Sequence, residues 1–273
     1  MRRSSSIICC SRCCSVTDEP WRTKYDADKR PLMPPIVATG QNLWYNDFCV
    51  FGGGGDELGF PAGSVLATPD EGGTMGKVIA SITTSVDGYV TGPDDGPEYG
   101  LGRGGERLHY WVMGGPWTYE GGHDFAMHGP DKQFYDELVS TMASGVVGRG
   151  MYDAAGAWGG TNPFPGTLFV LTHRTADQPA AQTGFRFVSD LDTALARAAE
   201  VAGDGDVGVG GGAEVIRQAL AAGKVDELVI STAPVILGAG KRLFEGFDRD
   251  MDLKVAKVYS SPYATHVRYT VTK

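Results

Sequence analysis

The sequence predicts an α/β protein, and two observations carry this prediction. From residue 75 onward, short apolar segments of strand length alternate with segments of helical periodicity. Toward the C-terminus, strand-like segments follow one another with no long helix between them. Alternating strands and helices are typical of a sheet flanked by helices. We therefore expect one α/β domain over 75–273 with a strand-rich end.

The first elements rest on apolar spacing. A buried strand is expected at 77–83, followed by a long glycine- and aromatic-rich irregular segment over 92–130. A helix is expected over 131–142, where Phe134, Leu138 and Met142 recur every four residues and Gly145 follows as a stop.

The later elements rest on capping and chain-turning residues. Ser189 or Asp190 caps a helix that runs to Ala202 and ends at Gly203. A second helix, from 213 to 222, is closed by Gly223. The remaining apolar segments predict strands at 146–147, 168–171, 185–188, 207–209, 227–233, 253–260 and 265–272.

Residues 1–74 lack sustained strand or helix periodicity and contain runs of serine, proline and glycine. Such a segment buries too little apolar surface to offset chain entropy. We expect either a disordered extension or a wrongly assigned start, with translation beginning at Met75. All five cysteines precede residue 50, and the cysteine-free remainder fits a reducing cytoplasm.

Composition excludes several classes of function. The net charge of −9 argues against broad nucleic-acid binding, which recruits lysine- and arginine-rich surfaces. The sequence has no apolar run of the roughly 18 residues that a membrane-spanning helix needs. The five histidines show no metal-ligand spacing, so no metal site is expected.

The most informative segment is 206–216, where a short apolar run meets Gly210, Gly211 and Gly212 before a helical pattern begins. Glycine lets backbone amides approach a ligand closely, and a helix N-terminus attracts anions. This combination suits a pyrophosphate. Two alternatives remain: a glycine turn needed only for packing, and a Rossmann G-x-G-x-x-A motif with Asp226 as the ribose-binding acid. A Rossmann domain normally opens with its motif, whereas this one comes late in the chain.

Two further strand ends carry cationic side chains. Arg149 follows the strand at 146–147, and Thr172, His173 and Arg174 follow the strand at 168–171. Parallel strands gather ligands at their carboxyl ends. The planar guanidinium of arginine gives bidentate contacts to phosphate, so both arginines are candidates for one phosphorylated ligand.

Five segments together resemble the dihydrofolate-reductase-like superfamily. More closely, they resemble proteins related to the reductase half of the bifunctional riboflavin-biosynthesis deaminase/reductase. The segments occur in the order seen in that superfamily, at 78–88, 147–149, 170–173, 209–213 and 234–244. The zinc signature of the deaminase half is missing, and Met151 stands where many relatives have threonine.

The resemblance implies a mixed, mainly parallel sheet flanked by helices, and NADPH as the hydride donor. The pyrophosphate of NADPH would be lined by Gly210, Gly211, Gly212, Ala213 and Glu214. Arg149 would meet a cofactor phosphate, and the loop of Thr172, His173 and Arg174 would hold the 2′-phosphate end. Relatives often carry a cis peptide bond between adjacent glycines at this bend.

The expected substrate pocket lies after the first strand. Ser85, Asp87 and Gly88 are expected to border it, with Gly238 opposite. Asp87 would bind the substrate, or act catalytically by relaying a proton if its pKa is raised; the alternative is that it only forms an Asp-Gly turn.

These residues favour an NADPH-dependent reductase of a flat nitrogen heterocycle, with a ribosylamino-pyrimidine of riboflavin biosynthesis or a dihydropterin as the small-molecule substrate. A non-catalytic dinucleotide-binding protein of the same fold and a Rossmann-type NAD(P) enzyme are the alternatives. The protein is expected to be cytoplasmic. The resemblance also makes a homodimer through its C-terminal strands possible.

Overall fold

The structure is a computed structural model, and it describes residues 76–97, 99–119 and 125–272. The predictions made for residues 1–74 and for a start at Met75 lie outside these residues. Among the described residues, no helix is long and apolar enough to cross a membrane.

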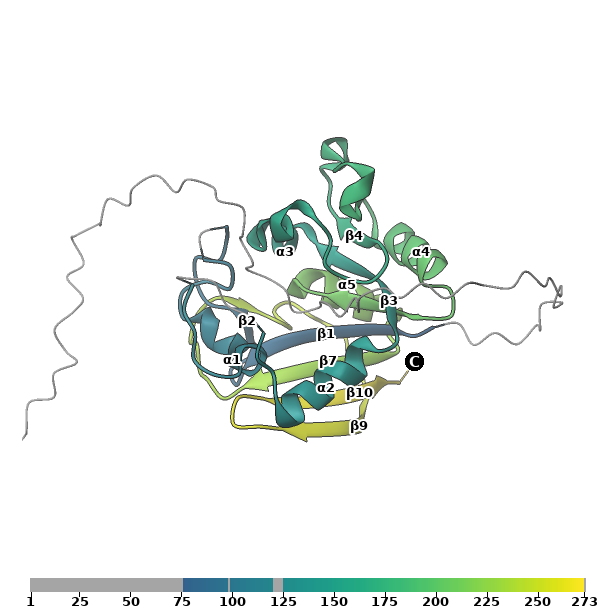
Figure 1. The fold of residues 1–273 in the computed structure, drawn as a ribbon. Helices are drawn as coiled ribbons and strands as arrows, with labels where there is room; N and C mark the ends of the chain where they lie inside the picture. Colours follow the sequence, from purple (N-terminus) through teal and green to yellow (C-terminus); the bar gives the residue numbers. More distant parts are fainter. Residues whose placement is uncertain (1–75, 98, 120–124, 273) are drawn as a thin grey trace, which may run out of the picture. The chain divides into compact units, whose positions relative to one another are not determined.

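An eight-stranded sheet forms the centre of the described region, with strand order β5-β4-β3-β6-β1-β7-β10-β9 (Figure 1). The strands from β5 through β7 are parallel to their neighbours, and β10 is antiparallel to both β7 and β9. The predicted mixed, mainly parallel sheet is therefore confirmed. Its strands are β1 Val78–Ser85, β3 Met142–Gly148, β4 Leu168–Leu171, β5 Phe185–Val188, β6 Asp206–Gly210, β7 Glu227–Ala233, β9 Leu253–Ser260 and β10 Thr265–Val271.

A separate two-stranded antiparallel ribbon pairs β2 Tyr89–Thr91 with β8 Lys241–Arg242. Short 3₁₀ segments connect the larger elements at Gly105–His109, Gly156–Gly160, Thr175–Asp177 and Ala181–Thr183. The helices are α1 Tyr110–Met113, α2 Gly129–Val139, α3 Arg149–Ala154, α4 Leu191–Ala202 and α5 Ala213–Ala221.

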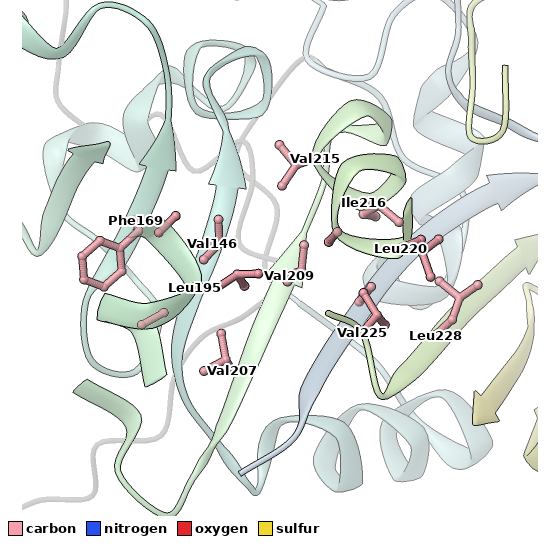
Figure 2. Packing of buried hydrophobic residues seen from close by; sticks show 14 of the residues in the cluster. Val146, Phe169, Leu195, Val207, Val209, Val215, Ile216, Leu220, Val225 and Leu228 are labelled. Carbon is pink, nitrogen blue, oxygen red and sulfur yellow. The ribbon is translucent and has the colours of Figure 1, made fainter. Parts of the chain in front are cut away.

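The inner strands of the sheet, such as β3 and β4, are buried on both faces, whereas the edge strand β9 is largely exposed. Neighbouring residues of a strand point to opposite faces. Val146 and Leu228 pack with α4 and α5 on one face, where Ile216 and Leu220 fill the core (Figure 2). The next residues along the same strands belong to other clusters. Val147 packs with the aromatic residues around the 3₁₀ segment after α3, and Val229 packs with α2.

Helix α4 matches its predicted boundaries. The Asp190 side chain accepts a hydrogen bond from the backbone amide of Thr193 at 2.8 Å, so Asp190, of the two candidate caps, is the one that caps the helix. Gly203 follows the last helical residue with φ of 59°, a conformation that favours glycine.

The predicted helix over 131–142 is wrong at both ends. Helix α2 ends at Val139, Met142 begins β3, and Gly145 pairs within that strand with Leu168. Met142 packs in the same buried cluster as Phe134 and Leu138. The spacing of these three residues therefore reflected a shared core across a turn and not a continuous helix.

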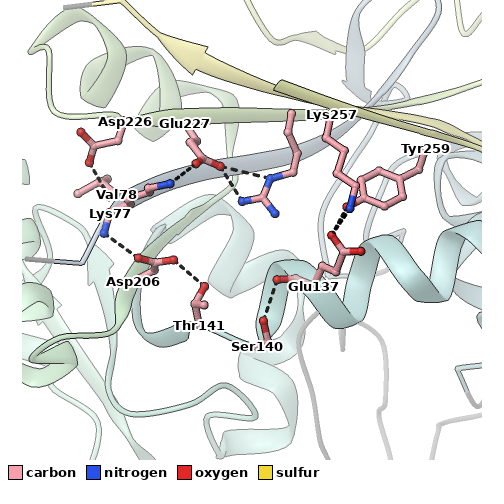
Figure 3. A network of polar contacts seen from close by, with 11 residues as sticks. Lys77, Val78, Glu137, Ser140, Thr141, Asp206, Asp226, Glu227, Lys257 and Tyr259 are labelled. Carbon is pink, nitrogen blue, oxygen red and sulfur yellow. Dashed lines mark hydrogen bonds and ion pairs between the residues drawn. The ribbon is translucent and has the colours of Figure 1, made fainter. Parts of the chain in front are cut away.

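Ion pairs and side-chain caps tie the amino ends of the strands together (Figure 3). The Glu227 carboxylate pairs with Lys77 and with Arg268, at 2.6 Å in each case. Asp226 accepts from the backbone amide of Val78 at 2.8 Å, and Asp206 accepts from that of Lys77 at 2.7 Å. These contacts leave the opposite, carboxyl edge of the sheet for a ligand.

Candidate active site

A cavity of about 760 Å³ lies along the carboxyl edge of the sheet. It is lined by the ends of β1, β3, β4 and β6 and by the start of α5. Ligand pockets in proteins are typically about 300–1,000 Å³ and open at this edge of parallel sheets. The cavity is therefore large enough for a sizeable ligand and lies where the topology favours one.

The glycine bend, residues 210–212, forms part of the cavity wall. It connects the end of β6 directly to α5, and the peptide bond between Gly211 and Gly212 is cis. The amide of Gly148 donates to the Gly211 carbonyl at 3.0 Å, which fixes the bend against the end of β3.

Helix α5 begins at this bend without a side-chain cap. Gly212 occupies the N-cap position and has no side chain to accept from the first amides of the helix. Ala213 and Glu214, the first two helical residues, also line the cavity. Amides without a side-chain cap and the positive end of the helix dipole together suit an anion, so the bend fits a phosphate group.

The Glu214 carboxylate is engaged by side chains of its own helix. The carboxylate accepts from Gln218 at 2.9 Å and also pairs with Arg217, both on the same helix. These hydrogen bonds, from Gln218 and then Arg217, hold the pKa of Glu214 below its usual value.

Arg149 lies at the start of α3, directly after β3. Its Nε donates to Asp153 at 2.7 Å, and its guanidinium lies over the Phe187 ring, 4.9 Å from the ring centroid. Among the described residues, its buried Nη1 has no hydrogen-bond acceptor. A buried charged donor without a partner is costly, and a ligand anion at this wall is one way to lower that cost.

Arg174 approaches the same carboxylate from the loop after β4. Its Nη2 lies 3.1 Å from Asp153 Oδ2, so Asp153 bridges the two arginines. Thr172 is buried, and its hydroxyl oxygen accepts from the Arg174 backbone amide at 3.1 Å. His173 also lines the cavity. The cationic residues selected from sequence are thus brought to one wall.

The residues expected around the substrate are not part of this wall. The cavity lining does not include Ser85, Asp87, Gly88 or Gly238. These residues lie where hydrogen bonds connect the loop after β1 with the loop after β7. Asp87 accepts from the Ser85 hydroxyl at 2.6 Å and from the Leu237 and Gly238 amides at 3.1 and 2.8 Å.

The proton-relay role expected for Asp87 depended on a raised pKa, and the hydrogen bonds around this carboxylate act in the opposite direction. Burial alone would raise the pKa of Asp87, but the hydrogen bonds from Ser85, Leu237 and Gly238 outweigh it and lower the pKa to about 2. Asp87 is therefore a carboxylate committed to the backbone of a neighbouring loop, which is the turn alternative.

Sequence reasoning also missed part of the cavity wall. Thr83 and Ser231 line the cavity, although strand positions of this kind look like ordinary core in a sequence. Trp111, which the sequence offered either as a stacking surface for a flat heterocycle or as a core residue, lines the cavity with them. Thr83 on β1 and Ser231 on β7 are register partners in the sheet. Two hydroxyl-bearing residues late in two apolar strands were the available signal.

The Rossmann alternative does not match the structure. Its ribose-binding acid would have to lie near the glycine bend, yet Asp226 binds the amide of Val78 at the amino end of β1. The antiparallel β10 and the strand order also differ from the Rossmann arrangement. In the part of the chain that is described, no group of three or more histidine, cysteine or acidic residues is arranged to hold a metal ion.

These features define an α/β protein with a ligand cavity at the carboxyl edge of a mixed sheet, walled by a glycine bend and two arginines. The family model for the RibD C-terminal domain matches residues 76–267. The chain belongs to the RibD C-terminal domain family. A search of curated protein sequences gives no significant match.

Several solved structures are similar to the chain at low identity. A crystal structure described as a riboflavin biosynthesis protein from Shewanella sp. PV-4 is 21% identical, with TM-score 0.53, covering 72% of this chain and 99% of that one. Dihydrofolate reductase from Enterococcus faecalis, complexed with NADP(H), is 18% identical, with TM-score 0.44, covering 73% and 98%. A bifunctional deaminase and uracil reductase from Thermotoga maritima is 14% identical, with TM-score 0.48, covering 72% and 57%.

Proposed function

We propose that the protein is an NADPH-dependent reductase of a flat nitrogen heterocycle. The observation that carries this proposal is the convergence of an uncapped helix N-terminus and two arginines on one cavity. A dinucleotide phosphate presents several anionic groups along its length, and these features are spaced along one wall to receive them. Membership of the RibD C-terminal domain family supports a reductase over a carrier.

Each wall residue has a role in holding such a cofactor. The amides of the glycine bend and of Ala213 and Glu214 would bind the pyrophosphate, and Arg149 would contact a phosphate beside it. Thr172, His173 and Arg174 would hold the 2′-phosphate end. When bound, the nicotinamide ring supplies a hydride, and the protein supplies placement and a route for a proton.

The substrate end of the cavity would take the heterocycle. Trp111, Thr83 and Ser231 provide a flat apolar surface beside two hydroxyl groups, which suits a ring with polar edges. One solved structure that resembles the chain is described as a riboflavin biosynthesis protein. We propose a ribosylamino-pyrimidine as the first candidate substrate and a dihydropterin as the second.

Fluorescence titration of the full chain with NADPH and NADH tests the cofactor assignment. We expect NADPH to bind the more tightly of the two. NADPH oxidation is then followed by absorbance with a panel of ribosylated pyrimidines and dihydropterins. Consumption with one class identifies the substrate. Tight NADPH binding without oxidation across the panel would favour a non-catalytic dinucleotide-binding protein, and no binding of either cofactor would refute the proposal.

A further inference from the structure

A chain of hydrogen bonds leads from the proposed substrate end of the cavity into the core. Ser231 lines the cavity, and its hydroxyl oxygen lies 2.7 Å from Nδ1 of His266. Nε2 of His266 lies 2.9 Å from Oδ1 of Asp131. The exposed fractions of the three residues are 3%, 0% and 3%. Three polar side chains from β7, β10 and α2 are thus linked in series beneath the wall.

The His266 ring is held in one orientation. Phe134 stacks on it at 4.0 Å between ring centroids with an interplanar angle of 12°, and Trp111 meets it edge-on at 4.8 Å and 75°. The two aromatic side chains hold the ring in this orientation, and the orientation keeps each ring nitrogen next to one polar partner. The imidazole therefore connects Ser231 to Asp131 with fixed geometry.

The protonation state of His266 sets the direction of the Ser231 hydroxyl. A carboxylate only accepts hydrogen bonds, so Nε2 carries a proton toward Asp131. In the neutral ring, Nδ1 then accepts the hydroxyl proton of Ser231. In the imidazolium form Nδ1 donates instead, and the Ser231 proton becomes available to a ligand in the cavity.

A second hydroxyl stands beside Ser231. Thr83 pairs with Ser231 in the sheet register, and its Oγ1 accepts from the indole Nε1 of Trp111 at 3.2 Å. With an oxygen lone pair used in this way, the hydroxyl proton of Thr83 can also point toward a ligand. The wall therefore presents two hydroxyl donors to the edge of a heterocycle.

We propose that Ser231 is the catalytic residue that delivers a proton during reduction, with His266 and Asp131 as the positioning residues that load it. This rests on the proposed function. As a hydride reaches the carbon of a substrate C=N or C=O bond, the π electrons move to the heteroatom. The heteroatom takes the Ser231 proton, and Ser231 takes the Nδ1 proton of His266. Neutral imidazole remains, and a solvent proton restores the imidazolium.

The surroundings of His266 favour release of this proton. Burial lowers the pKa of His266, and the nearby Asp131 opposes this shift only in part. An imidazolium formed here is therefore a stronger acid than usual, and turnover should fall as the pH rises. The other titratable or charged groups on the elements packed against His266 are Glu106, Arg107, His109, Tyr110, Lys132, Tyr135, Asp136, Glu137, Glu227, Lys254, Lys257, Tyr259, Arg268 and Tyr269.

Variants of the full chain separate this role from a structural one. Ser231→Ala should lower kcat by about 100-fold or more, the usual scale of general acid catalysis, with little change in NADPH affinity. Ser231→Thr, which keeps the hydroxyl, should recover part of that loss. The fall in kcat with rising pH should disappear in Ser231→Ala. Ser144→Ala is the matched control, since Ser144 is a buried serine on β3 that is absent from this cavity wall.

A spectroscopic measurement tests the same hydroxyl without turnover. In ¹⁵N-histidine-labelled protein, with the His266 signal assigned from His266→Gln, adding a pterin or a ribosylated pyrimidine should shift the Nδ1 resonance. The shift should be lost in Ser231→Ala.

The outcomes distinguish the two proposals. If the wild-type protein oxidises NADPH but Ser231→Ala keeps its kcat within threefold, proton delivery by Ser231 is overturned and the reductase assignment stands. If NADPH neither binds nor is consumed, the reductase assignment fails. The His266 resonance then decides: a Ser231-dependent shift keeps the hydroxyl as the contact to a heterocycle, and an unchanged signal with every probe overturns it.

Discussion

Two glycine-containing turns of this protein look alike in sequence and differ in what their backbone amides do. In the glycine bend, the amides at the start of α5 have no side-chain cap and face a cavity. In the second turn, which we call the Asp87 turn and define as residues 85–88 with 237–240, the Leu237 and Gly238 amides already bind the Asp87 carboxylate. One turn leaves donors for a ligand, and the other has used them.

The comparison teaches that a glycine-rich turn indicates a ligand site only where its donors remain unsatisfied. An acidic residue next to such a turn supplies an internal acceptor, whereas arginines next to it favour an external anion. The glycine bend has Arg149 nearby, and the Asp87 turn has its own carboxylate. Four variants sharpen this contrast.

The largest effect is expected at Gly240 in the Asp87 turn. Its φ is 126°, and a Cβ there would lie 1.9 Å from the Thr91 carbonyl oxygen. Gly240→Ala should lower the free energy of unfolding by about 3 kcal/mol or more, because backbone strain and overpacking add. Denaturant unfolding measures it. Gly238→Ala is the matched control: it has φ of 75° but open space at Cβ, so its cost should be nearer 1 kcal/mol. Equal losses for both would contradict the packing explanation.

The next effect is expected at the glycine-bend wall. Arg149→Ala should weaken the binding of both NADPH and NADH by about 1.5–3 kcal/mol, the usual contribution of a hydrogen bond to a charged group. Fluorescence titration measures both affinities. Arg249→Ala is the control, since Arg249 is exposed and lies off the cavity wall. An unchanged affinity in Arg149→Ala would remove this arginine from the site.

A smaller and more selective effect is expected at Arg174, whose side chain is 61% exposed. Arg174→Ala should weaken the binding of NADPH by an amount near the lower end of about 1.5–3 kcal/mol. It should change the binding of NADH far less, because only NADPH carries the 2′-phosphate. The ratio of the two dissociation constants is the measurement. Equal losses for both cofactors would assign Arg174 to a phosphate that they share.

The smallest effect is expected at Asp87. Because its pKa falls from 3.8 unfolded to about 2 folded, its carboxylate stabilises the fold above pH 3.8, and this contribution is lost as the pH falls toward 2. Asp87→Asn should therefore be less stable than wild type at neutral pH, with the gap closing in acid, and its NADPH affinity should be unchanged. Thermal unfolding across pH tests this. If the stability difference between Asp87→Asn and wild type widened in acid, the predicted sign of this pH dependence would be wrong.

Much of the fold followed from local signals. Capping by Asp190, termination at Gly203 and the apolar strand at 168–171 are decided by residues within a few positions of each other, and all three match the structure. The helix expected to reach Met142 failed because its apolar spacing continued into a strand that shares the same core. Local periodicity does not separate these two cases, since both bury the same side chains.

The candidate site divides in the same way. The glycine bend, Arg149 and Arg174 were recognisable because each lies at or shortly after the end of a strand, and strand ends of a parallel sheet converge. The hydrogen bonds that engage Asp87 could not be read from the sequence, because the two amides it binds lie about 150 residues away along the chain. His266 is joined to Ser231 across 35 residues and to Asp131 across 135 residues, so no short spacing in the sequence indicates the three together.

By itself, the sequence determined the long strands of the sheet, helix α4 and the late glycine bend, because these depend on residue type and short spacing. The tertiary structure alone decided which donors stay available and which polar side chains meet inside the core. Hydrogen-bond satisfaction is a property of groups brought together from distant segments, and it exists only once the sheet has set their register.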